Sequence, residues 1–535
     1  MKVKKIISML LVLVIPLGLL TGCGGGKSGK VEGLPEGTVT LSVGIPQNSN
    51  VSDYEDNEFT TYLQEEANVQ LEFVYFSNTA AEYKQQLSLM CAANEELPDV
   101  LLGFIFNQYV MHEFGDDGYF MDLTDYIDEY APNYKAQLEK LDEETREYIT
   151  EKGKSSKDGA YYGMPRVLCD AYDDLQSMMY INQTWLDNLG LQVPTTTDEL
   201  YSVLQAFKTK DPNKNGTADE IPMLGKLEIL NYLINGFVCY EQYSFNVTDG
   251  KVWDPVVTDE YRQALVYANK LVSEGLYSNL SFSTSAKEFK NLISPTDGPS
   301  KVGIFVGHHE NMTNPATDVL EEFVALPGLA DATGKGGYTI VNDPSMAWTA
   351  FITKDCEYPA AAMKFIDTFY TDETITRQRH GVEDVDWVRT EGENVCGTES
   401  YVEILNSEAY FSGNSTWCYN MCGIMTQENY LPIKSEGEGR IAEANRLAKE
   451  QWDVIKDAKQ PEERTNNLLY TTEEYEIREE KAGIVDSYIN EQIVLFAAGE
   501  KDPNNKAAWD EFLTNLESQG RSELMEICQK AYDRK

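Results

Sequence analysis

Residues 211–220 have the types and spacing of a loop that binds a hard cation. Oxygen-bearing side chains stand at positions 1, 3, 5 and 9, and Gly216 stands at position 6, as in an EF-hand loop. The glutamate expected at position 12 is replaced by Pro222, and Glu220 could supply the missing carboxylate. The segment predicts a structural Ca²⁺ site, and the alternative is a solvated Asn/Gly turn between two helices. The expected ligands are Asp211, Asn213, Asn215, Thr217 through its backbone carbonyl, Asp219 and Glu220.

Paired carboxylates are the other residues that could do chemistry, as the acid and base of glycoside hydrolysis. Such pairs occur at Asp116–Asp117, Asp173–Asp174 and Glu383–Asp384, but 88 acidic residues generate pairs by chance. Four histidines without an evident serine or cysteine partner give no catalytic triad. We therefore expect that the protein is not an enzyme.

The N-terminus has the pattern of a secreted and lipid-modified chain. Three lysines precede an apolar stretch, Ile6–Leu20, that is too short and too broken for a lasting membrane span. Leu20–Cys23 resembles the lipobox of bacterial lipoproteins, in which the cysteine thiol receives diacylglycerol. We expect a signal peptide at 1–22, a lipid on Cys23, a flexible tether at 23–37, and a protein anchored to the cell membrane on its extracytoplasmic side. The alternative is an ordinary signal peptide that happens to precede a cysteine.

Length and charge limit the class of protein. A chain of 535 residues is longer than one core usually serves, so two large lobes are the default. The net charge of −44 repels phosphate backbones, which excludes nucleic acid as a partner and favours a neutral ligand. Eight cysteines besides Cys23 lack the spacing of a disulfide framework, so the sequence leaves their pairing open.

Apolar periodicity predicts an α/β fold. Three strand patterns alternate with two helical patterns, in the order 39–45, 59–63, 69–75, 83–91 and 98–103. This alternation favours a parallel sheet, and such sheets bind ligands at the carboxyl ends of their strands. Those ends are expected near Gln47, Phe76 and Phe104.

Later segments extend the pattern. Gly159–Pro165 is expected to be a crossover between lobes, and the C-terminal third is expected to be helical. Further strands are predicted at 179–182, 302–306, 323–326 and 346–353, and further helices at 184–189, 200–207 and 360–370.

Several segments together resemble the extracellular solute-binding proteins of carbohydrate ABC importers. They follow the lipobox in order along nearly the whole mature chain, and they are Leu97–Val100, Asp158–Pro165, Ile181–Leu191, Asp211–Gly216 and Ala531–Arg534. Each segment alone is weak, but their order and spacing are specific. The branch that they resemble is the large one with the alginate-binding and lipoprotein-type receptors.

The resemblance implies a two-lobed, periplasmic-binding-protein-like α/β fold with a C-terminal helical extension. We expect residues 38–168 and 328–370 to form the N-terminal lobe, and residues 169–327 and 371–535 to form the C-terminal lobe. The family also carries a calcium site in the window of residues 211–220, which supports the six ligands named above.

The implied function is to capture an oligosaccharide outside the cell and deliver it to ABC transporter permease subunits by hinge closure. The expected partners are a neutral oligosaccharide, the permease subunits and, through the lipid anchor, the membrane. An extracellular glycan-processing enzyme and a surface adhesin or sensor remain alternatives. The sequence does not specify the sugar, its chain length or the permease.

Aromatic side chains are the expected sugar contacts, because sugar rings stack an apolar face on tryptophan or tyrosine. Trp348, Trp387 and Trp417 stand at strand ends or in polar, glycine-rich stretches, and local packing is their alternative role. Residues 380–387 resemble a family segment that lines the ligand cleft, although Asp384 replaces its second glycine. The candidate ligand-binding residues are Trp348, Trp387, Trp417, Glu383, Asp386, Phe104 and Tyr172, with the two carboxylates as acceptors of hydroxyl hydrogen bonds.

Overall fold

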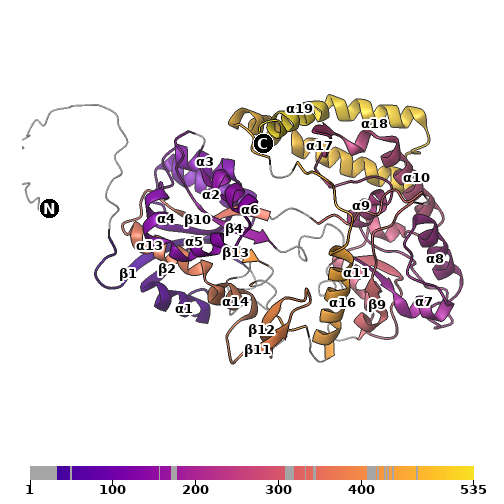
Figure 1. Cartoon of the computed structure of the whole chain (residues 1–535), viewed down its shortest axis with the longest axis horizontal. Coiled ribbons are helices and arrows are strands. Elements are labelled where there is room, and N and C mark those ends of the chain that lie inside the picture. The colour runs from indigo at the N-terminus through magenta and orange to yellow at the C-terminus, as the bar shows by residue number, and fades with distance from the viewer. Residues whose placement is uncertain are drawn as a thin grey trace, which may run out of the picture.

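The chain folds into two lobes, as expected (Figure 1). Among the described residues, the chain changes lobe between residues 169 and 178, between 341 and 345, and between 435 and 439. The computed structural model describes residues 33–48, 51–155, 157–169, 178–307, 318–331, 333–341, 345–405, 417, 421–426, 429, 433–435, 439–465 and 468–535.

The first lobe is built on a six-stranded sheet with the order β13-β4-β10-β3-β1-β2. β1 pairs in parallel with β2 and β3, β13 pairs in parallel with β4, and β10 runs antiparallel between β3 and β4. Leu41, Val43 and Ile45 of β1 are fully buried, as a central strand requires. The strands are β1 (Val39–Pro46), β2 (Val69–Phe76), β3 (Val100–Phe106), β4 (Met164–Cys169), β10 (Ser345–Ile352) and β13 (Gly423–Thr426).

Helices cover this sheet, and a separate two-stranded hairpin follows α14. The side chain of Asn57 accepts hydrogen bonds from the Phe59 and Thr60 N–H groups and so begins α1, and Asn68 ends α1 in the left-handed conformation. The helices are α1 (Glu58–Ala67), α2 (Ala80–Ala93), α3 (Gln108–Asp116), α4 (Thr124–Tyr130), α5 (Pro132–Glu139), α6 (Glu143–Gly153), α13 (Pro359–Asp367), η4 (Thr368–Tyr370) and α14 (Asp372–His380), and the hairpin is β11 (Trp387–Glu393) with β12 (Glu399–Ile404).

The second lobe is mostly helical around a three-stranded antiparallel sheet, β8-β5-β9. Its sheet strands are β5 (Met179–Asn182), β8 (Ile304–Val306) and β9 (Phe323–Ala325), and β6 (Asn246–Thr248) with β7 (Lys251–Trp253) forms a hairpin. Its helices are α7 (Gln183–Leu189), α8 (Thr197–Thr209), α9 (Leu227–Asn235), η1 (Pro255–Val257), α10 (Asp259–Ser273), η2 (Asn279–Phe282), α11 (Ala286–Ile293), η3 (Val319–Glu322), α16 (Gly439–Ile455), α17 (Thr472–Ala498), α18 (Lys506–Ser518) and α19 (Arg521–Tyr532).

A buried ion pair ties the C-terminal helices to this lobe. The Arg521 guanidinium donates to both carboxylate oxygens of Asp254, at 2.8 and 3.0 Å, and the two side chains are 6% and 5% exposed. The guanidinium also lies 4.1 Å from the centroid of the Phe245 ring. This bidentate contact fixes α19 against the loop that precedes α10.

The expected lobe boundary at residue 370 is wrong. α14 stays with the first lobe, where the Tyr62 and Thr374 hydroxyls lie 3.0 Å apart, and β13 adds a further strand beside β4. The reason is that β4 would otherwise present an unpaired sheet edge, which β13 covers. The expected start of the returning segment at 328 is also wrong, because the Ala330 N–H donates to the Thr195 carbonyl of the second lobe at 3.1 Å.

One element prediction fails. The segment Gly159–Pro165 leads into β4, and the passage between lobes follows that strand. The C-terminal third is largely helical, as expected, but β11, β12 and β13 interrupt it between α14 and α16. Most of β11 is exposed on both faces, so its sequence lacks the alternating apolar pattern that marks a half-buried strand.

Two further findings concern the membrane and the thiols. No helix in the described part of the chain is long and apolar enough to cross a membrane. No two of the seven cysteines that fall within the described ranges form a disulfide with each other.

Candidate functional site between the lobes

The carboxyl ends of the parallel strands lie along one edge of the six-stranded sheet. β10 runs antiparallel to both β3 and β4, so β3 and β4 run in the same direction, together with β1 and β2. Val167 near the end of β4 pairs with Met346 at the start of β10, which places both on this edge. The edge is where the sequence predicts a ligand, and it faces the second lobe.

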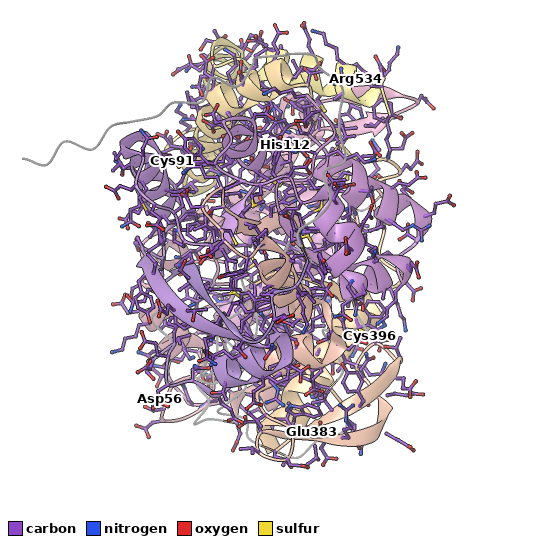
Figure 2. All side chains as sticks on the ribbon, turned by 90° about the vertical axis from the view of Figure 1, so that its left-hand side faces the viewer. Asp56, Cys91, His112, Glu383, Cys396 and Arg534 are labelled. Carbon is purple, nitrogen blue, oxygen red and sulfur yellow. The ribbon has the colours of Figure 1, made fainter. Side chains whose placement is uncertain are left out.

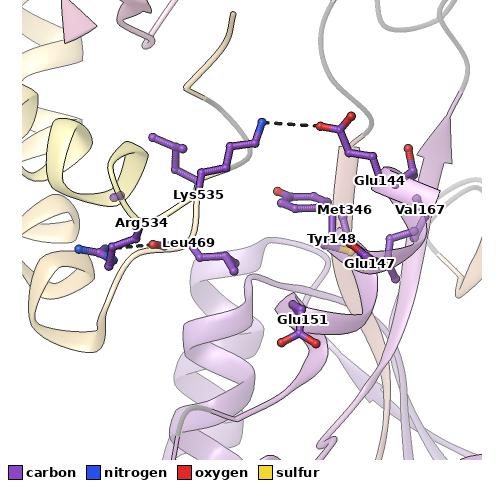
Figure 3. Close-up of a pocket in the computed structure, with 13 residues that line it drawn as sticks. Glu144, Glu147, Tyr148, Glu151, Val167, Met346, Leu469, Arg534 and Lys535 are labelled. Atoms are coloured by element: carbon purple, nitrogen blue, oxygen red, sulfur yellow. Dashed lines mark hydrogen bonds and ion pairs between the residues drawn. The ribbon is translucent and has the colours of Figure 1, made fainter. Parts of the chain in front are cut away.

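A cavity of about 640 Å³ opens between the lobes at this edge (Figure 3). Its volume lies within the range of small-molecule sites. Helix α6 supplies an acidic wall with an aromatic ring, and the C-terminal segments supply apolar and basic side chains. The principal lining residues are Glu144, Glu147, Tyr148, Glu151, Val167, Met346, Leu468, Leu469, Arg534 and Lys535.

One ion pair and one salt-bridged arginine define the basic side of the cavity. Lys535 Nζ lies 3.6 Å from Glu144 Oε1 and so connects the second lobe to α6 of the first (Figure 3). Both side chains are largely exposed, so this pair adds little stability. Arg534 donates to Glu474 at 2.9 Å and to the Leu469 carbonyl at 3.1 Å, which holds the arginine against its own lobe.

Beyond this cavity the lobes touch through a group of four residues, Asn107, Tyr109, Tyr470 and Tyr475, which we call the interlobe clasp. The Tyr109 ring of the first lobe stacks on the Tyr475 ring of the second, with 11° between their planes. The Asn107 amide donates to the Tyr475 hydroxyl at 2.6 Å, and the Tyr109 hydroxyl donates to the Tyr470 carbonyl at 3.2 Å.

The local sequence explains why these side chains sit at the edge. Asn107 follows the last residue of β3, and its side-chain oxygen accepts from the Tyr109 and Val110 N–H groups at 3.1 and 3.0 Å. This cap begins α3 directly after the strand. On the other lobe, Thr471 and Glu474 form a capping box that begins α17, so Tyr475 lies in its first turns.

Burial dominates the electrostatics of the clasp. It raises the pKa of Tyr109 to about 12, and it raises the pKa of Tyr475, with a further contribution from a hydrogen bond to Glu479. Both hydroxyls therefore stay neutral near physiological pH and keep their hydrogen bonds.

The predicted sugar platforms lie in the hydrophobic core of the first lobe. Trp348 is 2% exposed, Trp387 and Phe104 are fully buried, and Trp417 is 1% exposed. Trp417 packs against Phe59 and other rings, and its indole N–H donates to the Thr60 hydroxyl at 2.8 Å. In this conformation none of the four rings offers an exposed face, and the placement favours the packing role that the sequence left open.

The two predicted carboxylates stabilise the turn before β11. Glu383 accepts from Arg389 at 2.9 Å, and Asp386 accepts from the Val382 N–H at 2.9 Å. Asp384 has a φ of 65°, so it adopts the left-handed conformation that the family's glycine would favour. Glu383 lies at the opposite end of the molecule from Arg534 (Figure 2), far from the cavity between the lobes. The remaining candidates, Tyr172 and the lipidation site Cys23, lie outside the described residues.

The predicted calcium loop folds into a tight curl. Asp211, Lys214 and Gly216 all have positive φ, and the Asp211 carboxylate accepts from the Gly216 N–H at 3.2 Å. Asp219 accepts from the Asn213 and Asn215 amides, at 3.4 and 2.9 Å, and pairs with Lys301 at 2.8 Å.

Glu220 is the carboxylate of this loop whose hydrogen bonding is incomplete in the described structure. One of its carboxylate oxygens is buried without a hydrogen-bond partner in the described structure. Burial, and then the charges of Asp211 and Asp219, raise the pKa of Glu220. Within the described ranges, no three His, Cys, Asp or Glu side chains are gathered as a metal centre. A cation here would therefore also depend on amide and main-chain oxygens, which an EF-hand loop supplies.

Sequence reasoning missed the clasp and the cavity. The rule that ligands meet strand ends pointed to Phe104, but β3 continues to Phe106, so the residues that follow the strand are Asn107 and Tyr109. The strand end was therefore a usable signal, but the sequence pattern placed it near Phe104, before the true end of β3 at Phe106. Tyr475 lies 366 residues from Tyr109 along the chain, and no local pattern indicates that contact.

The chain belongs to the family of bacterial extracellular solute-binding proteins, whose model matches residues 48–375. This confirms the resemblance that its sequence segments indicate.

Two curated relatives and one solved structure illustrate the likeness. The fructooligosaccharide ABC transporter substrate-binding protein FusA of Streptococcus pneumoniae serotype 4 (strain ATCC BAA-334 / TIGR4) is 26% identical over 563 residues, which cover 100% of this chain and 99% of FusA. The polygalacturonan/rhamnogalacturonan-binding protein YtcQ of Bacillus subtilis (strain 168) is 29% identical over 314 residues, covering 57% of this chain and 58% of YtcQ. A FusA EF-hand mutant in complex with fructo-nystose has a TM-score of 0.71 at 21% identity, covering 92% of this chain and 99% of that one, which shows the same fold.

Proposed function

We propose that this protein is the lipid-anchored receptor of a carbohydrate ABC importer. It binds an oligosaccharide between its lobes, closes about the passages that join them, and presents the closed form to the permease subunits. The relative FusA, which this chain matches over its full length, supports an oligosaccharide as the solute. Cys23 is the proposed attachment point of the lipid.

The observation that carries the proposal is the cavity at the carboxyl edge of the sheet, lined by both lobes. Tyr148 offers an aromatic ring there, and Glu147 and Glu151 offer carboxylates that can accept hydrogen bonds from hydroxyls. A solute that touches both walls would bind the closed form more tightly than the open form, which is the thermodynamic requirement for closure.

The acidic wall favours a neutral sugar over a uronate chain. Glu144, Glu147 and Glu151 line one side of the cavity, and the net charge of −44 adds a repulsive field. A polygalacturonan ligand, such as the name of YtcQ gives for that relative, would meet this repulsion, whereas a fructooligosaccharide would not.

Calorimetry with two glycan panels tests the proposal. Neutral fructooligosaccharides and galacturonan oligosaccharides are titrated into the wild type, Tyr148→Ala and Tyr130→Ala. Tyr130 is a matched control, because it packs near Tyr126 within α4 and away from the cavity. We expect a neutral glycan to bind, with about tenfold weaker binding in Tyr148→Ala and none of this loss in Tyr130→Ala. The proposed site is refuted if a glycan binds wild type and Tyr148→Ala equally.

We also propose that the 211–220 loop binds a structural Ca²⁺. The orphaned oxygen of Glu220 and the converging charges of Asp211 and Asp219 support it, because a bound cation would stabilise all three. The EF-hand named for the FusA mutant gives a precedent in a relative of the same fold. We expect the bound ion to stabilise the fold.

Chelation tests the calcium site. EDTA should lower the melting temperature of metal-loaded wild type, and Asp211→Ala should lose this sensitivity. Asp249→Ala is the matched control, since Asp249 also has a positive φ, of 51°, but lies in the β6–β7 turn. A melting curve of the wild type that does not respond to EDTA would leave the loop as a solvated turn.

A further inference from the structure

The interlobe clasp joins the lobes by protein contacts alone. Its four residues come from the end of β3, the first turn of α3, the segment before α17 and the first turns of α17. The stack and both hydrogen bonds are made by protein atoms of the two lobes. These contacts between the lobes therefore do not require atoms of the solute.

Both halves of the clasp are held in place before they meet. The Asn107 side chain caps α3 with its oxygen and reaches Tyr475 with its nitrogen, so one side chain positions Tyr109 and crosses to the other lobe. On the second lobe, Glu474 belongs to the capping box of α17 and is also bound by Arg534. Pre-organised partners lose little conformational freedom when they dock, which strengthens the contact.

The second half is also supported from behind. The Arg478 guanidinium lies 4.4 Å from the centroid of the Tyr470 ring, next to the carbonyl that accepts from Tyr109. Half-buried, stacked rings with hydrogen-bonded hydroxyls are stronger than their area alone suggests. By comparison, the exposed Lys535–Glu144 ion pair is a weak contact between the lobes.

We propose that the interlobe clasp holds the lobes together without ligand and thereby sets the fraction of the protein in the closed state. A ligand then has to supply only the remainder of the free energy of closure, because its apparent affinity scales with the fraction already competent to bind. This consequence for affinity rests on the proposed function, but the closed fraction itself can be measured without any glycan.

Small-angle X-ray scattering of the ligand-free, full-length protein tests the clasp. Tyr475→Ala and Tyr109→Ala should each increase the radius of gyration, because the closed-to-open ratio falls about tenfold or more, equivalent to about 1.4 kcal/mol. Tyr475→Phe keeps the stack but loses the bond from Asn107, so it should expand the protein less. Tyr130→Ala removes a tyrosine from one lobe only and should scatter like the wild type.

A double-mutant cycle adds a second test. Because Tyr109 and Tyr475 share the ring stack but make separate hydrogen bonds, the double alanine variant should be more open than either single variant, but by less than the two single effects added together. Folded alanine variants that scatter like the wild type would overturn the proposal. If the alanine variants fail to fold, the Tyr109→Phe and Tyr475→Phe double variant removes both hydrogen bonds, and unchanged scattering of that variant would equally overturn it. Glycan binding by the wild type tests the proposed function separately.

Discussion

The two lobes bury different kinds of side chain. The first lobe packs aromatic rings on a six-stranded sheet, with Trp417 among Tyr54, Phe59 and Phe73. The second lobe relies on helices docked around a small sheet and buries the Arg521–Asp254 ion pair. Apolar packing does not depend on pH or salt, whereas a buried charge and its neighbours do. The lobes should therefore respond differently to the same perturbation.

Trp417→Ala should have the largest effect and should weaken the first lobe. The substitution leaves a large cavity in the aromatic cluster and removes the indole N–H that donates to the Thr60 hydroxyl, at a cost of about 4–5 kcal/mol of unfolding free energy. Urea unfolding measures this cost. A small loss of stability combined with a large loss of glycan affinity would instead show that Trp417 is a sugar platform.

Arg521→Ala should destabilise the second lobe by about 3–4 kcal/mol, because it leaves the Asp254 carboxylate buried without its partner. In differential scanning calorimetry the transition of the second lobe should move down while that of the first lobe stays in place. One merged transition that shifts as a whole would show that the lobes unfold as a single unit.

A pH titration should have a smaller effect than the Arg521 substitution, and it should act on the stability of the second lobe through Asp486 of α17. Burial raises the pKa of this carboxyl to about 6, although Arg521 and Arg478 oppose the rise. Between the ordinary carboxyl pKa and about 6 the folded state holds a proton that the unfolded state has released, so stability falls as pH rises through this window. Asp486→Asn should therefore raise the melting temperature at pH 7.5 but not at pH 4. An equal effect at both pH values would contradict this assignment.

The smallest expected effect concerns a helix cap in the second lobe. Thr471→Ala removes the capping box of α17 and should cost about 1 kcal/mol. Thr471→Ser keeps a hydroxyl acceptor and should restore most of the loss in the same urea titration. If the clasp depends on this cap, Thr471→Ala should also increase the radius of gyration slightly.

Local patterns predicted much of the fold. The strands and helices between Val39 and Phe106 follow the apolar periods closely, and α8 contains the helix that the sequence predicts at 200–207. The lobe boundaries were predicted less well, because they depend on the β4–β13 pairing between residues 257 positions apart. No local pattern reports a contact at that separation.

In the candidate site, too, some features could be predicted from local sequence patterns and others could not. The carboxyl edge of the sheet could be predicted, since it follows from strand direction. The identity of the exposed rings could not, because burial depends on the packed core: Trp348, expected at a strand end, lies in the middle of β10 and is 2% exposed. Tyr109 and Tyr475 meet only when the two lobes are in place.

The late position of β13 has a consequence for the order of folding. The first-lobe sheet is complete only when residues 423–426 reach β4, so most of the chain must be synthesised before this lobe can close its edge. Sequence-distant strand pairs form slowly, and domains that await them stay exposed for longer. Until β13 arrives, β4 is an unpaired sheet edge, and this edge is the segment that would need protection from aggregation.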